Sequence, residues 1–168
     1  MMQKYKGKLD NFFRWVKGTE LVELQEIDVA EDPVRPNLNF GFRTEYGRKI
    51  YGLKYEDNIE GIVCVAFTNE IPTTEKELEL MSKISSIEEN PTIAIAYTVW
   101  SRKRGAGREI ILKLKQFIDK EMPHIKRVVT LSPITPMATH FHIRNGAKLI
   151  TINDHTQNFE YKDAQGKT

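Results

Sequence analysis

Apolar residues follow two spacings along the chain, and these spacings predict a mixture of helices and strands. Apolar positions recur every three to four residues in four segments, the pattern of a helix with one buried face. We expect these helices at residues 5–16, 74–84, 108–122 and 137–144. Runs of β-branched and aromatic residues predict strands at 21–29, 49–55, 60–68, 92–100, 127–131 and 149–153.

The order of these elements predicts an α/β fold with a mixed sheet and helices on both of its faces. Residues 56–58 form a turn that makes a hairpin of the second and third strands, and the Pro- and Asn-bearing stretch 32–39 is expected to be loop. No internal repeat or linker divides the sequence. We therefore expect one domain at 1–161 and a polar tail at 162–168 that frays.

Two of the expected helices carry specific local signals. Thr74 to Glu77 fits the Ser/Thr-x-x-Glu capping box, and Leu78, Met81 and Ile84 are the expected buried face of the helix that follows. The helix at 5–16 has an apolar face that can join two subunits, so a homodimer is one expectation.

Composition and charge are those of an ordinary globular domain. A chain of 168 residues buries about 70% of its unfolded surface, which is enough for a core. With 25 basic and 23 acidic residues the net charge is only +2, so no overall field favours nucleic acid or a membrane. No apolar stretch reaches the length of a membrane span, and the first ten residues lack a signal peptide's apolar segment. These features predict a cytoplasmic protein without a membrane partner.

Cysteine and histidine usage predicts neither a disulfide nor a metal site. Cys64 is the only cysteine, lies in the apolar strand 60–68 and is expected to pack rather than react. The four histidines show no zinc-binding spacing. His140 and His142 lie two positions apart on a helix, so at most one of them faces a cleft.

The segment 102–107, RKRGAG, lies between a buried strand and an amphipathic helix and is the most informative part of the sequence. Gly105 and Gly107 allow a ligand close to the backbone, and the free N–H groups of the helix start favour a phosphate there. Cations at a helix start are unfavourable by roughly 0.3–1 kcal/mol each. Four of them crowd this one: Arg102, Lys103, Arg104 and Arg108. A bound anion would resolve that conflict, whereas the alternative is a solvated basic turn.

The spacing Arg-x-x-Gly-x-Gly resembles the Arg/Gln-x-x-Gly-x-Gly/Ala signature of the GNAT superfamily of N-acetyltransferases. This resemblance implies the GNAT fold, a mixed and mostly antiparallel sheet flanked by helices on both faces. It also implies that the loop holds the diphosphate of an acyl-coenzyme A, with the thioester beside Thr98 and Val99. The implied cofactor-binding residues are Val99, Arg102, Lys103, Arg104, Gly105, Ala106, Gly107 and Arg108.

From about Arg48 to Asn153 the chain also resembles the catalytic GNAT-fold domain of malonyl-CoA decarboxylases. The matching blocks lie at 49–52 with 62–68 and 71–74, at 94–99, at 122–126 with 129–134, and at 141–147 with 152–153; the last contains Phe-His-Ile-Arg-Asn-Gly-Ala. The resemblance implies that His142 is catalytic and acts with the hydroxyl of Thr98 on the malonyl carboxylate and the replacing proton. Two positions depart from the family pattern: Trp100 stands for its second strand serine and Cys64 for its hairpin glutamate.

We therefore expect an enzyme that moves an acyl group from acetyl-CoA, or another short acyl-CoA, to an amine. The amine attacks the thioester directly, and Tyr161 lies where many GNAT enzymes place a tyrosine that reprotonates the thiolate. The first alternative is malonyl-CoA decarboxylation to acetyl-CoA. The second is a catalytically silent module that binds CoA or nucleic acid. The acceptor stays open among small-molecule, peptide and nucleobase amines.

Overall fold

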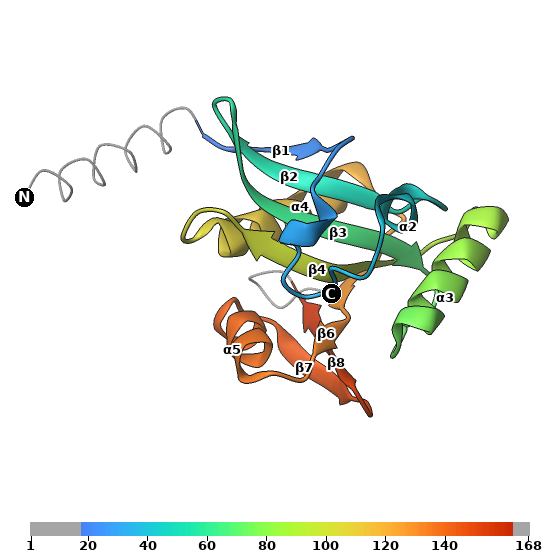
Figure 1. Ribbon diagram of the computed structural model, residues 1–168. Helices are drawn as coiled ribbons and strands as arrows, with labels where there is room; N and C mark the ends of the chain where they lie inside the picture. Colours follow the sequence, from blue (N-terminus) through green and yellow to red (C-terminus); the bar gives the residue numbers. More distant parts are fainter. Residues whose placement is uncertain (1–17, 163–168) are drawn as a thin grey trace, which may run out of the picture.

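The computed structural model describes residues 18–162. Its centre is an eight-stranded sheet with the order β1-β2-β3-β4-β5-β8-β6, in which β7 pairs with the free side of β8 (Figure 1). Only the β4–β5 pair is parallel; the other pairs are antiparallel, so the predicted mixed sheet is confirmed. The strands are β1 (Glu20–Glu23), β2 (Lys49–Tyr55), β3 (Asn58–Thr68), β4 (Ile93–Ser101), β5 (Arg127–Thr130), β6 (Ser132–Pro133), β7 (Lys148–Ile152) and β8 (Thr156–Tyr161).

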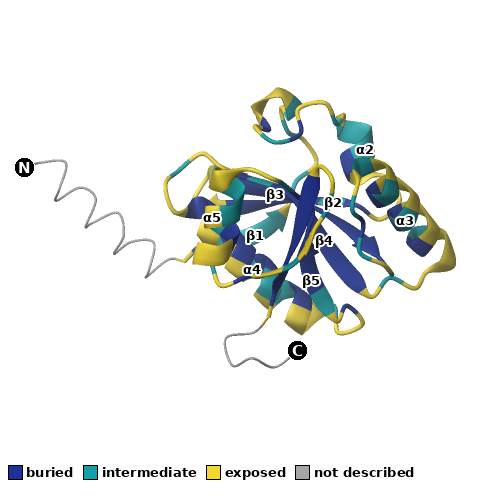
Figure 2. Ribbon diagram, turned by 90° about the horizontal axis from the view of Figure 1, so that it is seen from below, coloured by how far each residue is buried: buried dark blue, intermediate teal, exposed yellow. Residues whose placement is uncertain are grey.

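Helices cover both faces of this sheet, because each face is apolar. The helical elements are the 3-10 turn η1 (Val29–Glu31) and the α-helices α2 (Phe40–Thr44), α3 (Glu75–Glu88), α4 (Ala106–Glu121) and α5 (Pro136–Arg144). The apolar stripe of α4 packs on one face, where it meets Val63, Val65 and Ala96. Leu78 of α3 packs on the other face with Ile62 and Tyr97. The central strands are buried between these layers (Figure 2).

Most expected elements are present, and the differences have local causes. The hairpin is confirmed, with a turn in which Glu56 takes a φ of 54°. The expected edge strand 21–29 ends at Glu23. The expected strand 127–131 stops at Thr130, and the two-residue strand β6 that follows continues the pairing with β8 that β5 begins. β8 was not expected; its six residues are all buried, so no alternation marks it. The expected helix at 5–16 lies outside the described residues.

The prediction for the buried face of α3 was partly wrong. Leu78 is buried as expected, but Ile84 is 44% exposed, and Ser82 and Ser85 face the interior instead. The cause is Arg48, a fully buried side chain whose Nε donates to Ser82 Oγ at 2.8 Å. A hydroxyl can accept that hydrogen bond and an aliphatic side chain cannot. The predicted cap is confirmed, since Thr74 Oγ1 accepts from Glu77 N at 3.0 Å.

β4 and β5 separate at the middle of the sheet, and this separation shapes the site. Their pairing runs from Ile93 opposite Arg127 to Ala96 opposite Thr130, and a last hydrogen bond joins Leu131 N to Ala96 O at 3.2 Å. The β3–β4 register shifts at the same level, which places a bulge in β4 at Tyr97. β4 continues beyond this point to the loop before α4, so its far half is free of a parallel neighbour.

Candidate functional site

The loop between β4 and α4 presents unpaired backbone N–H groups. Gly105 is the N-cap of α4 with a φ of 86°, a left-handed conformation that glycine adopts readily, and no side chain caps the helix. Ala106 N donates to Lys103 O at 3.1 Å. In the described part of the chain, no group accepts a hydrogen bond from the backbone N–H groups of residues 104, 105, 107 and 108. These groups, at the positive end of the helix dipole, make a site for an anion.

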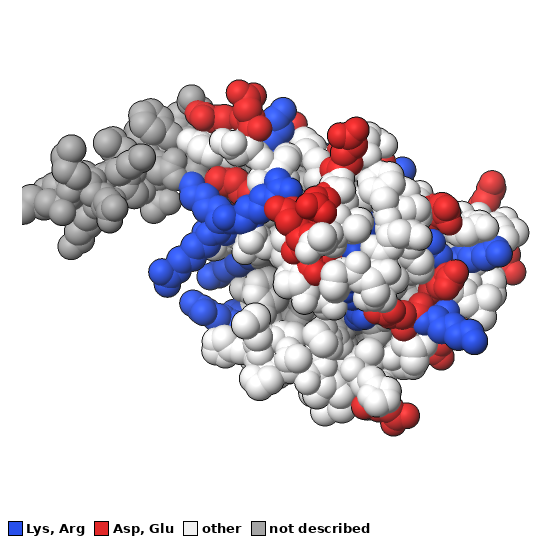
Figure 3. Space-filling view, in the orientation of Figure 1, with Lys and Arg blue, Asp and Glu red and all other residues white. Residues whose placement is uncertain are grey.

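The four cations around this loop divide into two pairs. Arg102 and Lys103 are engaged: Arg102 binds Glu31 with two hydrogen bonds of 2.6 and 3.1 Å, and Lys103 lies 3.4 Å from Glu60. The hydrogen bond from Arg102 lowers the pKa of the Glu31 carboxyl. Arg104 and Arg108 are exposed and have no acidic partner within residues 18–162. Lys and Arg gather over this end of the molecule (Figure 3).

Small residues at the start of α4 let two other elements approach. A Cβ on Gly107 would lie 3.1 Å from Cε2 of Phe141, so α5 can pack this closely only against a glycine. A Cβ on Gly61 of β3 would lie 3.3 Å from the carbonyl oxygen of Ala106. The second glycine of the loop therefore positions α5, which carries His142.

His142 and Tyr161 form a buried pair between α5 and β8. His142 Nδ1 lies 2.7 Å from the Tyr161 hydroxyl oxygen, and the imidazole stacks on Phe159 at 5.0 Å. Burial lowers the pKa of His142 to about 4 and raises that of Tyr161. Both groups are therefore neutral near pH 7. When Tyr161 donates to Nδ1, the proton of the imidazole sits on Nε2, which makes no hydrogen bond to any described residue.

Thr98 belongs to a different network. Its hydroxyl donates to Asp32 Oδ1 at 2.8 Å, and Asp32 Oδ2 lies 2.8 Å from Nη1 of Arg43. Asp32 and Arg43 have no exposed side-chain surface. Among residues 18–162, no hydrogen bond joins Thr98 to His142. The structure thus brings two of the three expected catalytic residues together and ties the third to a buried ion pair.

Arg35 crosses the gap where β4 and β5 separate, and sequence reasoning missed it. Its Nε donates to Tyr97 O at 2.9 Å and its Nη2 to Leu131 O at 2.8 Å, so the guanidinium joins the two strands. Its Nη1 pairs with Glu75 at 2.6 Å. The stretch 32–39 was expected only as a loop; its prolines indicate a fixed course, but nothing in the pattern shows that its charges are buried.

The remaining candidate residues lie near the loop without a free reactive group. Val99 is half-buried against the α4 face of the sheet, while Trp100 packs on the opposite face. Cys64 is fully buried, and burial raises its pKa to about 11, which agrees with the expectation that it packs. The described residues include no group of three potential metal ligands. No helix among them has both the length and the apolar character to cross a membrane.

The solved structures that resemble this chain include malonyl-CoA decarboxylases and an acetyltransferase in complex with CoA. Malonyl-CoA decarboxylase from Agrobacterium vitis is similar with a TM-score of 0.58 and 18% identity, over 88% of this chain and 43% of the decarboxylase. The decarboxylase from Cupriavidus metallidurans gives 0.51 and 20%, over 76% and 34%. A Bacillus subtilis acetyltransferase in complex with CoA gives 0.55 and 9%, over 84% and 93%. No family model matches the sequence, and no curated protein matches it either.

These likenesses define the fold. The chain has the GNAT fold that acetyltransferases and malonyl-CoA decarboxylases share, as the loop signature predicted. It spans less than half the length of the two decarboxylases.

Proposed function

We propose that this protein is an acyl-CoA-dependent acyltransferase, which moves an acetyl or another short acyl group from coenzyme A to an amine. The observation that carries the proposal is the set of N–H groups at residues 104, 105, 107 and 108, next to Arg104 and Arg108; within residues 18–162 neither these amides nor these cations have a partner. A diphosphate offers acceptors for these amides and neutralises the two charges. The likeness to a CoA-bound acetyltransferase supports the same assignment of the loop.

The free half of β4 leads from this loop toward the centre of the sheet, where the thioester would lie beside Thr98 and Val99. The amine nitrogen attacks the thioester carbonyl carbon, the new C–N bond forms and the C–S bond breaks. The thiolate leaves with the electron pair and takes up a proton, while the amide nitrogen loses one. Positioning of the two reactants supplies much of the rate.

The neutral pair of His142 and Tyr161 suits hydrogen-bond donation better than proton transfer. Because the pKa of His142 is about 4, its imidazole is neutral at pH 7, and a neutral imidazole is a poor proton donor. Its Nε2–H can instead donate a hydrogen bond to an oxygen on which negative charge develops. Tyr161 holds the imidazole in the required tautomer through Nδ1. We assign His142 this donor role and Tyr161 the positioning role.

Malonyl-CoA decarboxylation is the second candidate, and the donor role of His142 favours it equally. There the bond to the carboxylate carbon breaks, its electron pair forms a thioester enolate, carbon dioxide leaves and the enolate carbon takes a proton. A neutral Nε2–H donor would stabilise the enolate oxygen. The Thr98 hydroxyl donates its hydrogen bond to Asp32, so it is not free to act on a malonyl carboxylate as the resemblance implied.

The first test is binding of acetyl-CoA by calorimetry. We expect Arg104→Glu to weaken binding at least tenfold, because an unpaired cation at the diphosphate site becomes an anion. Lys120→Glu is the matched control: it reverses a charge of the same sign in the last turn of α4, about 21 Å along the helix from its start, and binding should not change. Absence of heat with any CoA derivative, together with salt-sensitive oligonucleotide binding, would support the binding-module alternative.

Mass spectrometry separates the two reactions. Acetyl-CoA formed from malonyl-CoA alone, and lost in His142→Ala, would establish decarboxylation. Acyl transfer to an added amine without turnover of malonyl-CoA would establish the transferase. Screening polyamines, peptide amines and aminated nucleobases then identifies the acceptor.

A further inference from the structure

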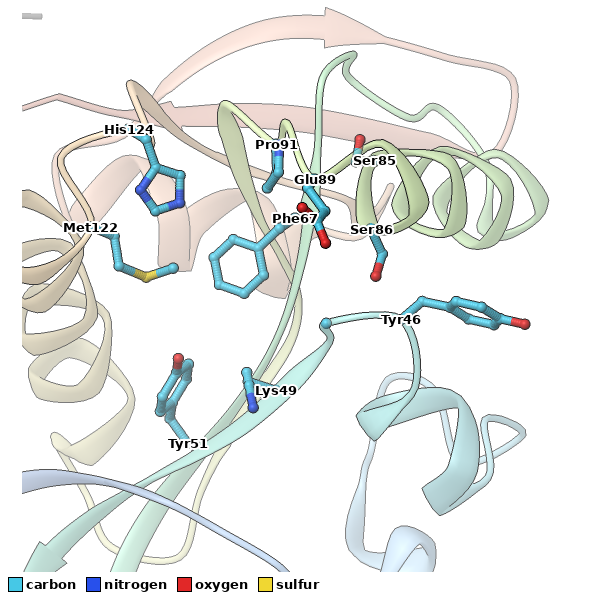
Figure 4. Close-up of a pocket in the computed structure, with 11 residues that line it drawn as sticks. Tyr46, Lys49, Tyr51, Phe67, Ser85, Ser86, Glu89, Pro91, Met122 and His124 are labelled. Atoms are coloured by element: carbon cyan, nitrogen blue, oxygen red, sulfur yellow. The ribbon is translucent and has the colours of Figure 1, made fainter.

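A groove of about 300 Å³ lies at the opposite end of the sheet from the 102–107 loop (Figure 4). Pro91 precedes β4 and Met122 follows α4, and both line the groove. The loop, in contrast, follows β4 and precedes α4. The 16-residue helix α4 therefore separates the two places by about 24 Å. The groove has no part in the chemistry proposed above.

One wall of the groove is apolar. Its apolar lining residues include Phe67, Pro91 and Met122, with the ring of Tyr51 nearby (Figure 4). Burial, with a smaller contribution from Glu23, raises the pKa of Tyr51 to about 12, so its hydroxyl stays uncharged. Aromatic faces and a thioether pack against an apolar body, and the aromatic faces also attract a cation. This wall can hold a compact hydrocarbon or aromatic group.

The helix ends and Glu89, which lies beside Pro91 and Phe67, give the groove a negative potential (Figure 4). Both α3 and α4 end at the groove, so the negative ends of two helix dipoles point toward it. Glu89, the C-cap of α3, has no ion pair in the part of the chain that the structure describes. Its carboxylate points toward the space beside Phe67 (Figure 4).

The other polar groups of the rim do not cancel this charge. Lys49 is compensated by Glu23, whose carboxylate lies 3.1 Å from its Nζ. Ser86 adds a hydroxyl and His124 an imidazole. With the Lys49–Glu23 pair counted as neutral, the charge that remains at the groove is the Glu89 carboxylate, which has no ion pair within residues 18–162, and it is strengthened by two helix ends.

We propose that this groove is a second ligand site, which binds a small organic cation: a primary amine on a compact apolar or aromatic body. The ammonium lies against the Glu89 carboxylate, and the body packs on Phe67, Pro91 and Met122. An anion is disfavoured by both helix ends and by Glu89. A metal ion is disfavoured because the groove offers a single carboxylate, whereas hard cations take several oxygen ligands.

Calorimetry with 2-phenylethylamine tests the proposal on the full chain, with 2-phenylethanol as an uncharged analogue of similar shape. We expect saturable binding of the amine and at least tenfold weaker binding of the alcohol. Glu89→Gln should weaken amine binding at least tenfold, and Glu89→Lys should abolish it. Glu88→Gln is the matched control, since it removes the neighbouring charge from a side chain that does not line the groove, and amine binding should persist.

The same experiment distinguishes this site from an amine acceptor site at the thioester. Arg104→Glu should leave 2-phenylethylamine binding unchanged while it weakens CoA binding at least tenfold. If CoA does not bind at all and Glu89-dependent amine binding remains, the proposed function fails and this inference stands. Equal binding of amine and alcohol, or amine binding that Glu89→Gln leaves intact, would overturn it.

Discussion

Charged side chains that are fully buried hold the 32–43 segment against the sheet. Asp32 accepts hydrogen bonds from the backbone N–H groups of Val34 and Arg35, from Thr98 and from Arg43. Burial disfavours the charge of Arg43, but the hydrogen bond to Asp32 opposes this effect and the pKa of Arg43 is raised. A buried pair of this kind is costly to break, because the partner that remains is left charged without water.

Asp32→Asn should therefore lower the free energy of unfolding by about 3–5 kcal/mol, since it leaves the Arg43 guanidinium buried without a countercharge. Urea unfolding followed by fluorescence measures the change. Lys115→Gln, which breaks the i,i+4 pair with Asp119 on the surface of α4, should cost less than about 0.5 kcal/mol. Similar losses in both variants would contradict the role of the buried pair.

The pKa of His142 predicts how stability depends on pH. The folded protein holds this imidazole with a pKa of about 4, against an ordinary value of 6.5. Between these values the unfolded chain takes up a proton that the folded one does not, so the contribution of His142 is complete above pH 6.5 and is lost as the pH falls toward 4. At about 1.4 kcal/mol per pKa unit, the loss approaches about 3 kcal/mol. Urea unfolding of wild type and His142→Gln at pH 7 and pH 5 isolates this effect; equal pH slopes would refute it.

At the level of elements, two glycines share a left-handed backbone conformation, but only one of them lies at the proposed diphosphate site. Gly105 before α4 and Gly146 after α5 have φ values of 86° and 92°, and a Cβ at either position would meet nothing within 4 Å. Alanine at either site should cost about 1 kcal/mol of stability. Only Gly105→Ala should also weaken acetyl-CoA binding, since only that turn presents N–H groups to the proposed diphosphate. Calorimetry on both variants checks this; unaltered CoA binding in Gly105→Ala would contradict it.

The elements that sequence patterns predicted best are those whose buried positions are apolar. α4, with one apolar stripe, and the β2–β3 hairpin, whose strands are buried over most of their length, are present within two residues of their expected bounds. β8 and the buried side of α3 escaped prediction because several of their buried positions are polar. Asn158 is fully buried and donates to Pro72 O and Thr130 O, and Ser82 is buried because Arg48 needs an acceptor. Such partners are distant in sequence, so no local pattern shows them.

The candidate site was predicted in parts. The loop glycines and cations, His142 and Tyr161 each follow from a motif or a resemblance. Their pairing does not, since His142 and Tyr161 meet only through the packing of α5 on β8. Arg35 was missed entirely because its partners are backbone carbonyls of two strands that separate, a feature of topology rather than of sequence.

For the whole molecule, α4 places the two proposed ligand sites at its opposite ends. Its N-terminus faces the proposed diphosphate site and its C-terminus lies beside the groove of Glu89. The two sites are too far apart to share a side chain, so acetyl-CoA and 2-phenylethylamine should stabilise the protein additively. Urea unfolding with each ligand and with both measures this; a departure above about 0.5 kcal/mol would show that the sites are coupled.

The buried position of Cys64 makes its labelling rate a measure of how often the sheet opens. The thiol is the only one in the chain and lies on a central strand with no exposed surface. A maleimide dye can reach it only when β3 comes away from its covering layer, so the labelling rate follows that opening event. Ligands bound at either end of α4 should slow the dye in proportion to the stability they add, without any engineered probe.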